Sequence, residues 1–235
     1  MVLTILSGIV LAVTVPAALL LRGPPARPVV ATMDAPQSDM TLGRALTSPQ
    51  FIVLMATNFF CCATHSGPIF HTVSYAEMCG IAALAAVSIY SVEGIAGMFG
   101  RIGFGVLGDR FGAKRVLVAG LLVQAFGTLG YYFAHDLAAF YAVAALFGFI
   151  YSGIMPLYAV LVRENFPVAM LGTIIGGTSM AGSLGMATGP VLGGWIFDQT
   201  GGYGLLYISC FALGLAAFAV AMTFRPFVRG ALLVA

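Results

Sequence analysis

Apolar residues fall into seven long runs separated by shorter polar segments. Each run is long enough to cross the ~30 Å hydrocarbon core of a bilayer as a helix. The third and sixth runs are the longest, so helices over them would have to tilt. The pattern predicts an all-α integral membrane protein with seven transmembrane helices. The predicted spans are Met1–Leu21, Pro49–Val73, Ile81–Leu107, Val116–Ala134, Leu137–Val162, Val168–Phe197 and Tyr203–Phe224.

The longest polar interruption separates the first run from the other six. It contains four prolines and few large apolar residues, which is typical of an extended linker. The remaining runs are joined by short turns, which indicates one domain of six helices. The predicted organisation is a single transmembrane helix at 1–22, a cytoplasmic linker at 23–48, a six-helix domain at 49–226 and a cytoplasmic tail at 227–235.

Composition supports the membrane assignment, and the charges orient the chain. Hydrophobic residues make up 60% of the 235 residues and charged residues only 8%, against about 25% charged in a soluble domain. If all seven runs cross, nine of the ten Lys and Arg residues lie on one side. Basic loops stay in the cytoplasm. We therefore predict a multi-pass protein of the plasma or inner membrane, with its amino terminus outside and its carboxyl terminus in the cytoplasm.

The third and sixth runs are related by a shift of 89 positions. We interpret the match as an internal repeat, a common feature of secondary transporters. The shift carries Gly100, Gly105, Asp109 and Gly112 onto Gly189, Gly194, Asp198 and Gly201. Both runs are rich in glycine, which lets membrane helices approach closely. We expect these two helices to contact each other through their glycines, and Gly185, Gly189 and Gly193 line one face of the sixth run.

The link between the third and fourth runs combines glycines with charges. It reads Gly105-Val-Leu-Gly-Asp109-Arg110-Phe-Gly112-Ala-Lys114-Arg115 and predicts a tight turn. The pattern G-x-L-x-D-R-x-G-x-K-x-x-L resembles the signature loop of the major facilitator superfamily of secondary transporters. The sequence departs from that loop at Ala113, where the family usually has a basic residue.

This resemblance implies a fold and a place for the chain within it. Members typically have twelve helices in two halves, so the chain resembles the sixth to twelfth helices of a member. Its last six helices would then form one half, which is built from 3+3 inverted repeats. On this basis we expect a truncated or half-length chain that assembles with a separate amino-terminal half or a second copy. The resemblance also implies a conformational latch on the cytoplasmic side, made of Gly105, Asp109, Arg110, Gly112 and Lys114.

Further segments resemble the monocarboxylate and oxalate/formate transporters within this superfamily. They are His71-Thr-Val-Ser-Tyr75-Ala, Gly100-Arg101, and the stretch from Gly189-Pro190 to Tyr203. This resemblance implies a small organic anion, such as a monocarboxylate, as the substrate, with a proton as the candidate coupling ion. Oxalate/formate exchangers use a Lys in the helix that corresponds to the sixth run, which has none here, so a dicarboxylate is not supported.

Two charged residues lie inside the third predicted span. An Arg near mid-membrane costs about 2.5–3.5 kcal/mol on insertion scales, so it normally faces a cavity or a partner. Glu93, Gly97 and Arg101 are four apart and are predicted to share one stripe. Arg101 is the candidate anion-binding residue because its guanidinium matches a carboxylate, and Glu93 would tune it or carry a proton. Alternatively, Arg101 reaches toward the cytoplasm and is satisfied by Asp109 and loop carbonyls.

Four further side chains complete the candidate substrate site. Asn58 and His65 are seven residues apart in the second span and share a face. Tyr151 and Tyr158 have the same spacing in the fifth span and can hydrogen-bond a polar ligand. Alternatively, the two tyrosines only pack against neighbouring helices. The alternative for His65 is a hydrogen bond to a neighbouring backbone group.

No enzymatic chemistry is predicted from the motifs. The chain has no serine-hydrolase, zinc-protease or phosphate-loop pattern, and its four cysteines lack metal-binding spacing. We therefore expect no catalytic residue, cofactor, metal or nucleic-acid partner. The predicted function is secondary active transport of a small organic anion by alternating access across the lipid bilayer. Two alternatives stay open: a seven-helix membrane receptor or sensor, and a non-transporting fragment that needs a separate amino half.

Overall fold

The computed structural model describes residues 2–20 and 40–227 and divides the chain into two compact units, Met1–Gln37 and Ser38–Ala235. The first unit contains helix α1 (Val2–Leu20), which coincides with the first predicted span. Much of the predicted linker and nearly all of the predicted tail lie outside the described residues.

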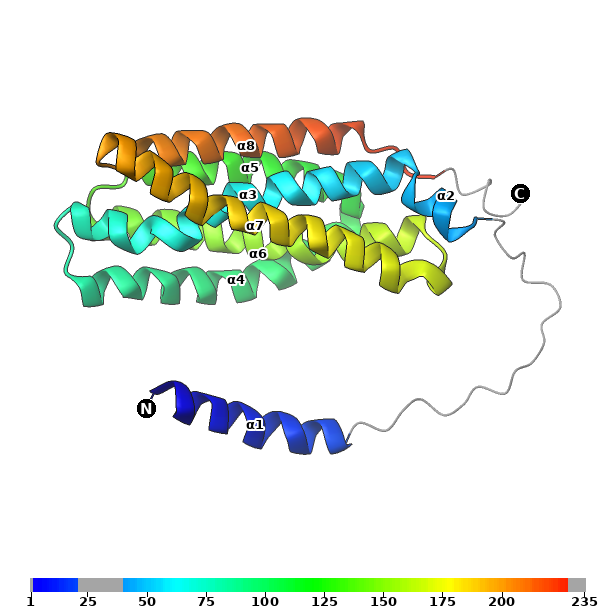
Figure 1. Cartoon of the computed structure of the whole chain (residues 1–235), viewed down its shortest axis with the longest axis horizontal. Helices are drawn as coiled ribbons and strands as arrows, with labels where there is room; N and C mark the ends of the chain where they lie inside the picture. Colours follow the sequence, from blue (N-terminus) through cyan, green and yellow to red (C-terminus); the bar gives the residue numbers. More distant parts are fainter. Residues whose placement is uncertain (1, 21–39, 228–235) are drawn as a thin grey trace. The chain divides into compact units, whose positions relative to one another are not determined.

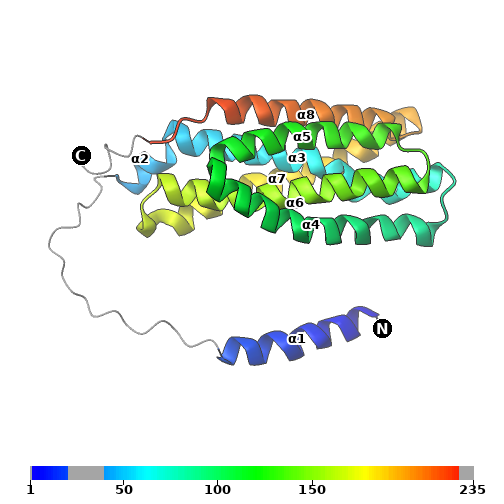
Figure 2. The same ribbon diagram turned by 180° about the vertical axis from the view of Figure 1, so that it is seen from behind.

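The second unit is a bundle of long helices joined by short connections (Figures 1 and 2). Its helices are α2 (Leu42–Leu46), α3 (Pro49–Met78), α4 (Ala83–Phe111), α5 (Ala113–Phe133), α6 (Leu137–Asn165), the short 3-10 helix η1 (Val168–Met170), α7 (Leu171–Thr200) and α8 (Gly204–Thr223). Among the described residues, six helices are long and apolar enough to cross a membrane, with η1 and α7 counted as one. They correspond to the second to seventh predicted spans.

Local chemistry fixes where several of these helices begin and end. The side chain of Ser48 accepts a hydrogen bond from the backbone N–H of Phe51, and Pro49 occupies the first turn of α3, where its missing N–H costs nothing. Asp136 caps α6 by accepting from the N–H of Ala139 at 2.9 Å. Gly201 ends α7 in the left-handed conformation, with φ of 66°. Polar caps and glycines therefore set these boundaries.

Helix α2 was not predicted, because it lies inside the segment interpreted as a linker. Thr41 precedes it in extended backbone, and its hydroxyl accepts from the N–H of Arg44. Ala45 is completely buried and belongs to the hydrophobic core. The last part of the predicted linker is therefore a capped helical turn attached to the bundle.

The two glycine-rich helices do not pair with each other in the way the sequence suggested. Instead α4 packs most closely against α6, and α7 against α3. A Cβ added at Gly100 of α4 would lie 1.9 Å from the backbone oxygen of Phe149 in α6. A Cβ at Gly185 of α7 would lie 2.2 Å from the backbone oxygen of Phe59 in α3. Glycine is needed in both places because backbones touch, but the partner helices differ from those expected.

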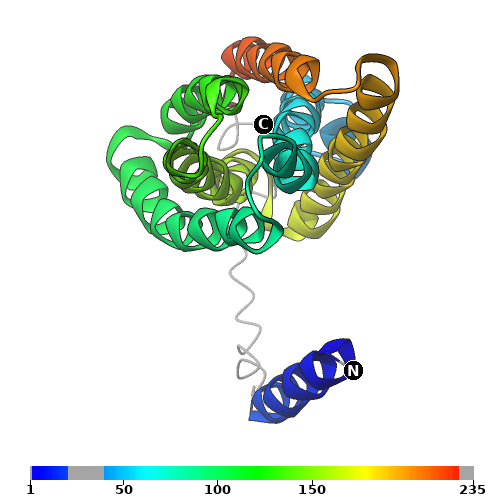
Figure 3. The same cartoon turned by 90° about the vertical axis from the view of Figure 1, so that its left-hand side faces the viewer.

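The remaining contacts follow a matching arrangement, which the end-on view makes clear (Figure 3). Helix α3 packs against α8, α6 packs against α5, and α5 packs against α8. Exchanging α3, α4 and α5 with α6, α7 and α8 therefore maps the principal helix pairs onto one another. A shift of 89 positions also carries the bounds of α3, α4 and α5 to within two residues of those of α6, α7 and α8. Helix lengths thus repeat along with the motif.

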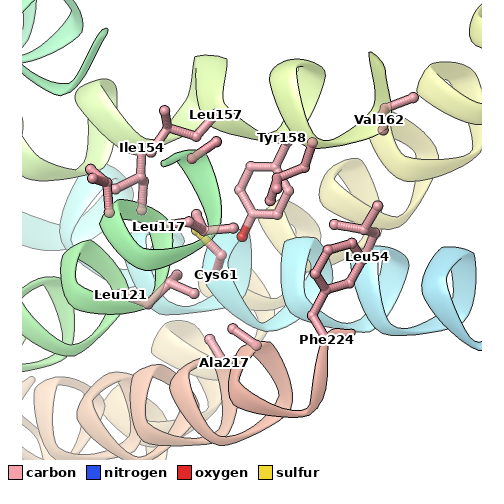
Figure 4. Packing of buried hydrophobic residues seen from close by; sticks show 14 of the residues in the cluster. Leu54, Cys61, Leu117, Leu121, Ile154, Leu157, Tyr158, Val162, Ala217 and Phe224 are labelled. Carbon is pink, nitrogen blue, oxygen red and sulfur yellow. The ribbon is translucent and has the colours of Figure 1, made fainter. Parts of the chain in front are cut away.

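Buried side chains form two hydrophobic clusters within the bundle. One includes Leu54, Leu121 and Ile154 and gathers side chains from α3, α5, α6 and α8 (Figure 4). The other centres on Tyr131, whose ring packs against those of Phe140 and Tyr207. Of the candidate-site residues, Tyr158 belongs to the first cluster and Tyr151 packs against the second.

Candidate functional site

Helix α4 presents Glu93 and Arg101, the two charged residues inside its apolar run, in different directions. Its buried stripe runs through Ile89, Glu93, Gly97, Gly100 and Phe104. Arg101 is exposed and lies off this stripe. A step of four residues overshoots one helical turn by about 40°, so eight residues rotate a side chain by about 80°. The prediction that Glu93 and Arg101 share one stripe is therefore wrong.

Glu93 is enclosed where α4 meets α6. Its side chain is only 4% exposed, and its Oε2 atom is buried without a hydrogen-bond partner. Gly148 of α6 makes room for it, since a Cβ there would lie 2.8 Å from Cγ of Glu93 and 2.3 Å from its backbone oxygen. A buried carboxyl group with an unpaired oxygen is costly when ionised. At this position the unpaired oxygen of Glu93 is costly unless a further partner satisfies it.

Three tyrosines are close enough to this carboxyl group to feel its charge. The phenols of Tyr90, Tyr131 and Tyr151 lie within electrostatic range of Glu93. The Tyr131 hydroxyl is also buried without a partner, whereas the Tyr90 hydroxyl donates to the backbone oxygen of Ile69. Two unpaired polar groups, one able to donate and one able to accept, thus lie near each other in the interior.

Tyr151 lies within electrostatic range of both the buried Glu93 and the exposed Arg101. Its phenol is half-buried. Its ring packs against that of His65, with centroids 5.1 Å apart. Four of the six predicted substrate-site residues, Glu93, Arg101, Tyr151 and His65, are therefore neighbours or are joined through Tyr151.

His65 is held by helix α5. It is 4% exposed, and its Nδ1 lies 3.3 Å from Nε2 of Gln124, which also donates to the backbone oxygen of Cys61 at 3.1 Å. Because the Gln124 amide nitrogen can only donate, Nδ1 of His65 is the acceptor in this contact. The histidine is thereby fixed in orientation beside Tyr151.

Asn58 lies at the contact between α3 and α7. Its Nδ2 donates to the backbone oxygen of Thr178 at 2.7 Å, and its Oδ1 lies 3.6 Å from the thiol of Cys62. Gly182 abuts the same amide. Both polar ends of Asn58 are therefore engaged within the bundle, and the bond to Thr178 joins α3 to α7.

Tyr158 is separate from the other candidates. It belongs to the hydrophobic cluster around Leu54 and Ile154, and it is 5% exposed. Figure 4 shows its hydroxyl pointing toward Cys61, between α3 and α6. This hydroxyl has no hydrogen-bond partner that meets ordinary geometry. Although Tyr151 and Tyr158 are seven residues apart, they belong to different clusters.

Arg101 lies on a broad apolar face of α4. Its exposed neighbours include Met98, Phe99 and Ile102, which are 63–68% exposed. Helix α7 has a similar face, with Leu184, Val191 and Trp195 exposed by 59–73%. Both helices are less buried within the unit than α3, α5 or α6. These faces are where a further protein surface or lipid would contact the unit.

The turn between α4 and α5 is shorter than the segment Gly105–Arg115 that the motif predicted as a turn. Helix α4 continues through Asp109 to Phe111, and only Gly112 separates it from α5. Gly112 has φ of 89°, a left-handed conformation that side chains rarely adopt. Asp109 and Arg110 are exposed in the last turn of α4, and Lys114 is half-buried in the first turn of α5. The tight turn is confirmed, whereas Gly105 lies within the helix rather than in the turn.

Comparison with known proteins identifies the family. The family profile described as Major Facilitator Superfamily matches residues 101–231, more than half of the chain. The chain belongs to the Major Facilitator Superfamily. It is 28% identical over 122 residues to the uncharacterised transporter YuxJ of Bacillus subtilis, and this match covers 52% of this chain and 31% of that protein. It is 28% identical over 143 residues to an uncharacterised transporter of Methanocaldococcus jannaschii, covering 61% and 37%.

A third relative of this superfamily protein has a more specific description. The multidrug resistance protein MdtG of Proteus mirabilis is 27% identical over 121 residues, covering 52% of this chain and 30% of that protein. The matches span about a third of the length of each of these three relatives. Superfamily membership and the six apolar helices place the chain among multi-pass membrane proteins of a transporter family rather than among enzymes.

Sequence reasoning missed several residues at the candidate site. Tyr90 and Tyr131 lie within electrostatic range of Glu93, and the Gln124 amide contacts His65. Gln124 had a detectable signal, since an amide inside an apolar span needs an internal partner. The tyrosines had no comparable signal, because apolar helices commonly carry aromatic residues. In the described part of the chain, no group of three or more metal-ligating side chains comes together.

Proposed function

We propose that this protein is a secondary active transporter of a small organic anion, such as a monocarboxylate, working by alternating access. The observation that carries the proposal is Arg101, a cation exposed on the otherwise apolar face of α4 within a membrane-spanning helix. A cation in that position is costly unless it faces water or a partner. A carboxylate substrate supplies a partner of matching shape through two parallel hydrogen bonds.

Glu93 and Tyr151 extend this proposal to a coupling proton. A proton on Glu93 would neutralise a carboxyl group that is buried with one unpaired oxygen. Tyr151 interacts electrostatically with both Glu93 and Arg101, so protonation of one and anion binding at the other would influence each other. His65 stacks on the same tyrosine and would set its position. Asn58 and Tyr158 would contribute less directly to substrate binding. Asn58 donates to the backbone of α7, and Tyr158 lies within the hydrophobic cluster around Leu54.

Alternating access would follow from the repeated architecture. We propose that α3–α5 and α6–α8 are 3+3 inverted repeats, supported by the shift of 89 positions and the matching helix pairs. The exposed faces of α4 and α7 would then meet a separate amino-terminal half or a second copy of the chain. The turn at Gly112, with Asp109, Arg110 and Lys114, would act as the latch at the cytoplasmic end. Helix α1 would cross the membrane with its amino end outside.

Uptake of labelled monocarboxylates into proteoliposomes tests the proposal. The chain is reconstituted alone and with a separately expressed amino-terminal half. Arg101→Lys keeps the charge and removes the bidentate fork, so uptake should fall by about ten- to hundred-fold, the worth of one charged hydrogen bond. Arg163→Lys, an exposed arginine at the end of α6, is the matched control and should transport normally. Equal uptake by the two variants would exclude Arg101 as the anion site.

A second candidate function is export of lipophilic compounds. One relative is described as a multidrug resistance protein. The exposed residues around Arg101 are mainly large and apolar, which would suit a lipophilic substrate. Efflux of an apolar fluorescent dye that is insensitive to Arg101→Lys, combined with no carboxylate uptake, would favour this function over anion transport.

A further inference from the structure

A groove lies between the first turns of α5 and the last turns of α8. Lys114, Arg115, Val118 and Ala119 line it from α5, and Phe218 and Met222 line it from α8. It encloses about 460 Å³ and is broadly open to the surroundings. Two cations thus stand at one end of a groove whose other lining residues are all apolar.

The position of the groove along the bundle matters for its occupant. Arg44, Arg110, Arg163 and Arg225 lie at the same end of the unit, where α3, α5 and α7 begin and α4, α6 and α8 end. Among the described residues, the opposite end carries Glu77, Asp136 and Asp198 but no Lys or Arg, whereas the basic end also holds Asp109 and Glu164. Basic ends of membrane helices face the cytoplasm. In that orientation the two cations of the groove would lie at the depth of the cytoplasmic headgroups, and its apolar part would extend toward the hydrocarbon.

We propose that this groove binds an anionic phospholipid. Arg115, which is exposed, and Lys114, which is half-buried, would contact the phosphate oxygens of the headgroup. An acyl chain would lie along Val118, Phe218 and Met222. Both helices continue with exposed apolar side chains beyond the groove, including Val123, Phe126 and Leu215, so the chain would remain in an apolar environment. The described lining residues include no carboxylate that would repel the headgroup.

Charge and shape together favour a lipid over a soluble anion. Anionic lipids give the cytoplasmic leaflet a negative surface potential that attracts juxtamembrane Lys and Arg residues. A soluble phosphate would use the cations and leave the apolar part of the groove unoccupied. A zwitterionic lipid would fill the groove but would gain little from Lys114 and Arg115. The occupant that uses both parts of the groove is a lipid with a net negative headgroup.

Fluorescence quenching by brominated lipids tests the site directly. Trp195, the only tryptophan, lies near the opposite end of α7 and is 62% exposed, so it reports on lipid elsewhere. A second protein carries Trp195→Phe and Met222→Trp, which places the reporter in the groove. Each protein is titrated with brominated phosphatidylglycerol or brominated phosphatidylcholine in detergent micelles. The measurement is independent of transport, so it can fail without affecting the proposed function, and the reverse also holds.

The proposal predicts that the reporter at 222 is quenched at a several-fold lower fraction of phosphatidylglycerol than of phosphatidylcholine, whereas Trp195 shows no preference. Arg115→Gln should reduce that preference by about five-fold, while Arg115→Lys should largely retain it, because each cation near an anionic surface contributes similarly. Arg163→Gln removes a charge from the same end outside the groove and should have no effect.

Two results would overturn the proposal. One is equal quenching of the reporter at 222 by both lipids. The other is a preference that survives the double change of Lys114 and Arg115 to Gln. Displacement of brominated phosphatidylglycerol by millimolar glycerol phosphate would also reject the lipid site, since it would show recognition of the soluble headgroup alone. The Arg115→Lys protein guards against misfolding, because it tests the same position with its charge retained.

Discussion

The contact between α4 and α6 gives the most direct test of the fold, because two glycines in α4 differ only in what they face. A Cβ at Gly100 would lie 1.9, 2.7 and 2.9 Å from backbone atoms of Phe149. A Cβ at Gly94 would have no atom within 4 Å. Both residues have ordinary helical backbone, so alanine changes only packing and helix propensity. Gly100→Ala and Gly94→Ala therefore form a matched pair.

The expected difference follows from these distances. To restore an ordinary contact of 3.4 Å, α6 would have to move by about 1.5 Å from α4, and the obstacle is backbone that cannot rotate away. Overpacking of this kind costs about 1–3 kcal/mol, and we take the upper value because the clash is with backbone. Alanine regains about 1 kcal/mol of helix propensity. The net change is a loss of about 2 kcal/mol for Gly100→Ala and a gain of up to about 1 kcal/mol for Gly94→Ala.

Thermal unfolding in detergent, followed by the fluorescence of Trp195, measures the difference. For a chain of this size 1 kcal/mol corresponds to about 2–4 °C, so Gly100→Ala should unfold about 4–8 °C below the wild type. Gly94→Ala should unfold at the wild-type temperature or slightly above it. If the two variants unfolded at the same temperature, the close approach of α4 and α6 would be refuted.

Three further predictions address the candidate site and its turn. Glu93→Gln should preserve or raise the unfolding temperature, because it removes a buried ionisable group. The same change should abolish the stimulation of uptake by an inward proton gradient. Retained stimulation would argue against Glu93 as the proton carrier. Asp109→Asn should slow the maximal rate of uptake without much change in the substrate concentration for half-maximal rate, whereas a loss of binding would contradict its role in a latch. Gly112→Ala should destabilise the protein by about 1–3 kcal/mol, because a residue with a side chain is strained at φ of 89°. The measurement is a lower unfolding temperature. Gly105→Ala is the control, because a Cβ at Gly105 would have open space around it.

The sequence predicted the helices well because a bilayer constrains length and polarity together. The last six predicted spans each correspond to a helix, and most of their ends fall within four residues of the prediction. Helix α2 was missed because a five-residue turn has no hydrophobic period of its own. Its existence depends on a tertiary contact, the burial of Ala45, which a local pattern does not contain.

The candidate site was less predictable than the helices. A charged residue inside an apolar span was recognised as a candidate, but spacing alone did not determine its direction, since Glu93 is buried and Arg101 exposed. The glycine faces were recognised, but their partners were not, because any helix with a small face can satisfy them. Tyr131 and Gln124 reach the site from α5, across long sequence separations that no motif links.

The single residue between α4 and α5 has a consequence for how the protein is made. A connection as short as Gly112 keeps the end of α4 directly beside the start of α5. The two helices would enter the membrane as one hairpin, and the apolar α5 would offset the cost of admitting Glu93 and Arg101 with α4. Lengthening this connection would separate the two insertion events and expose α4 to failed insertion during synthesis.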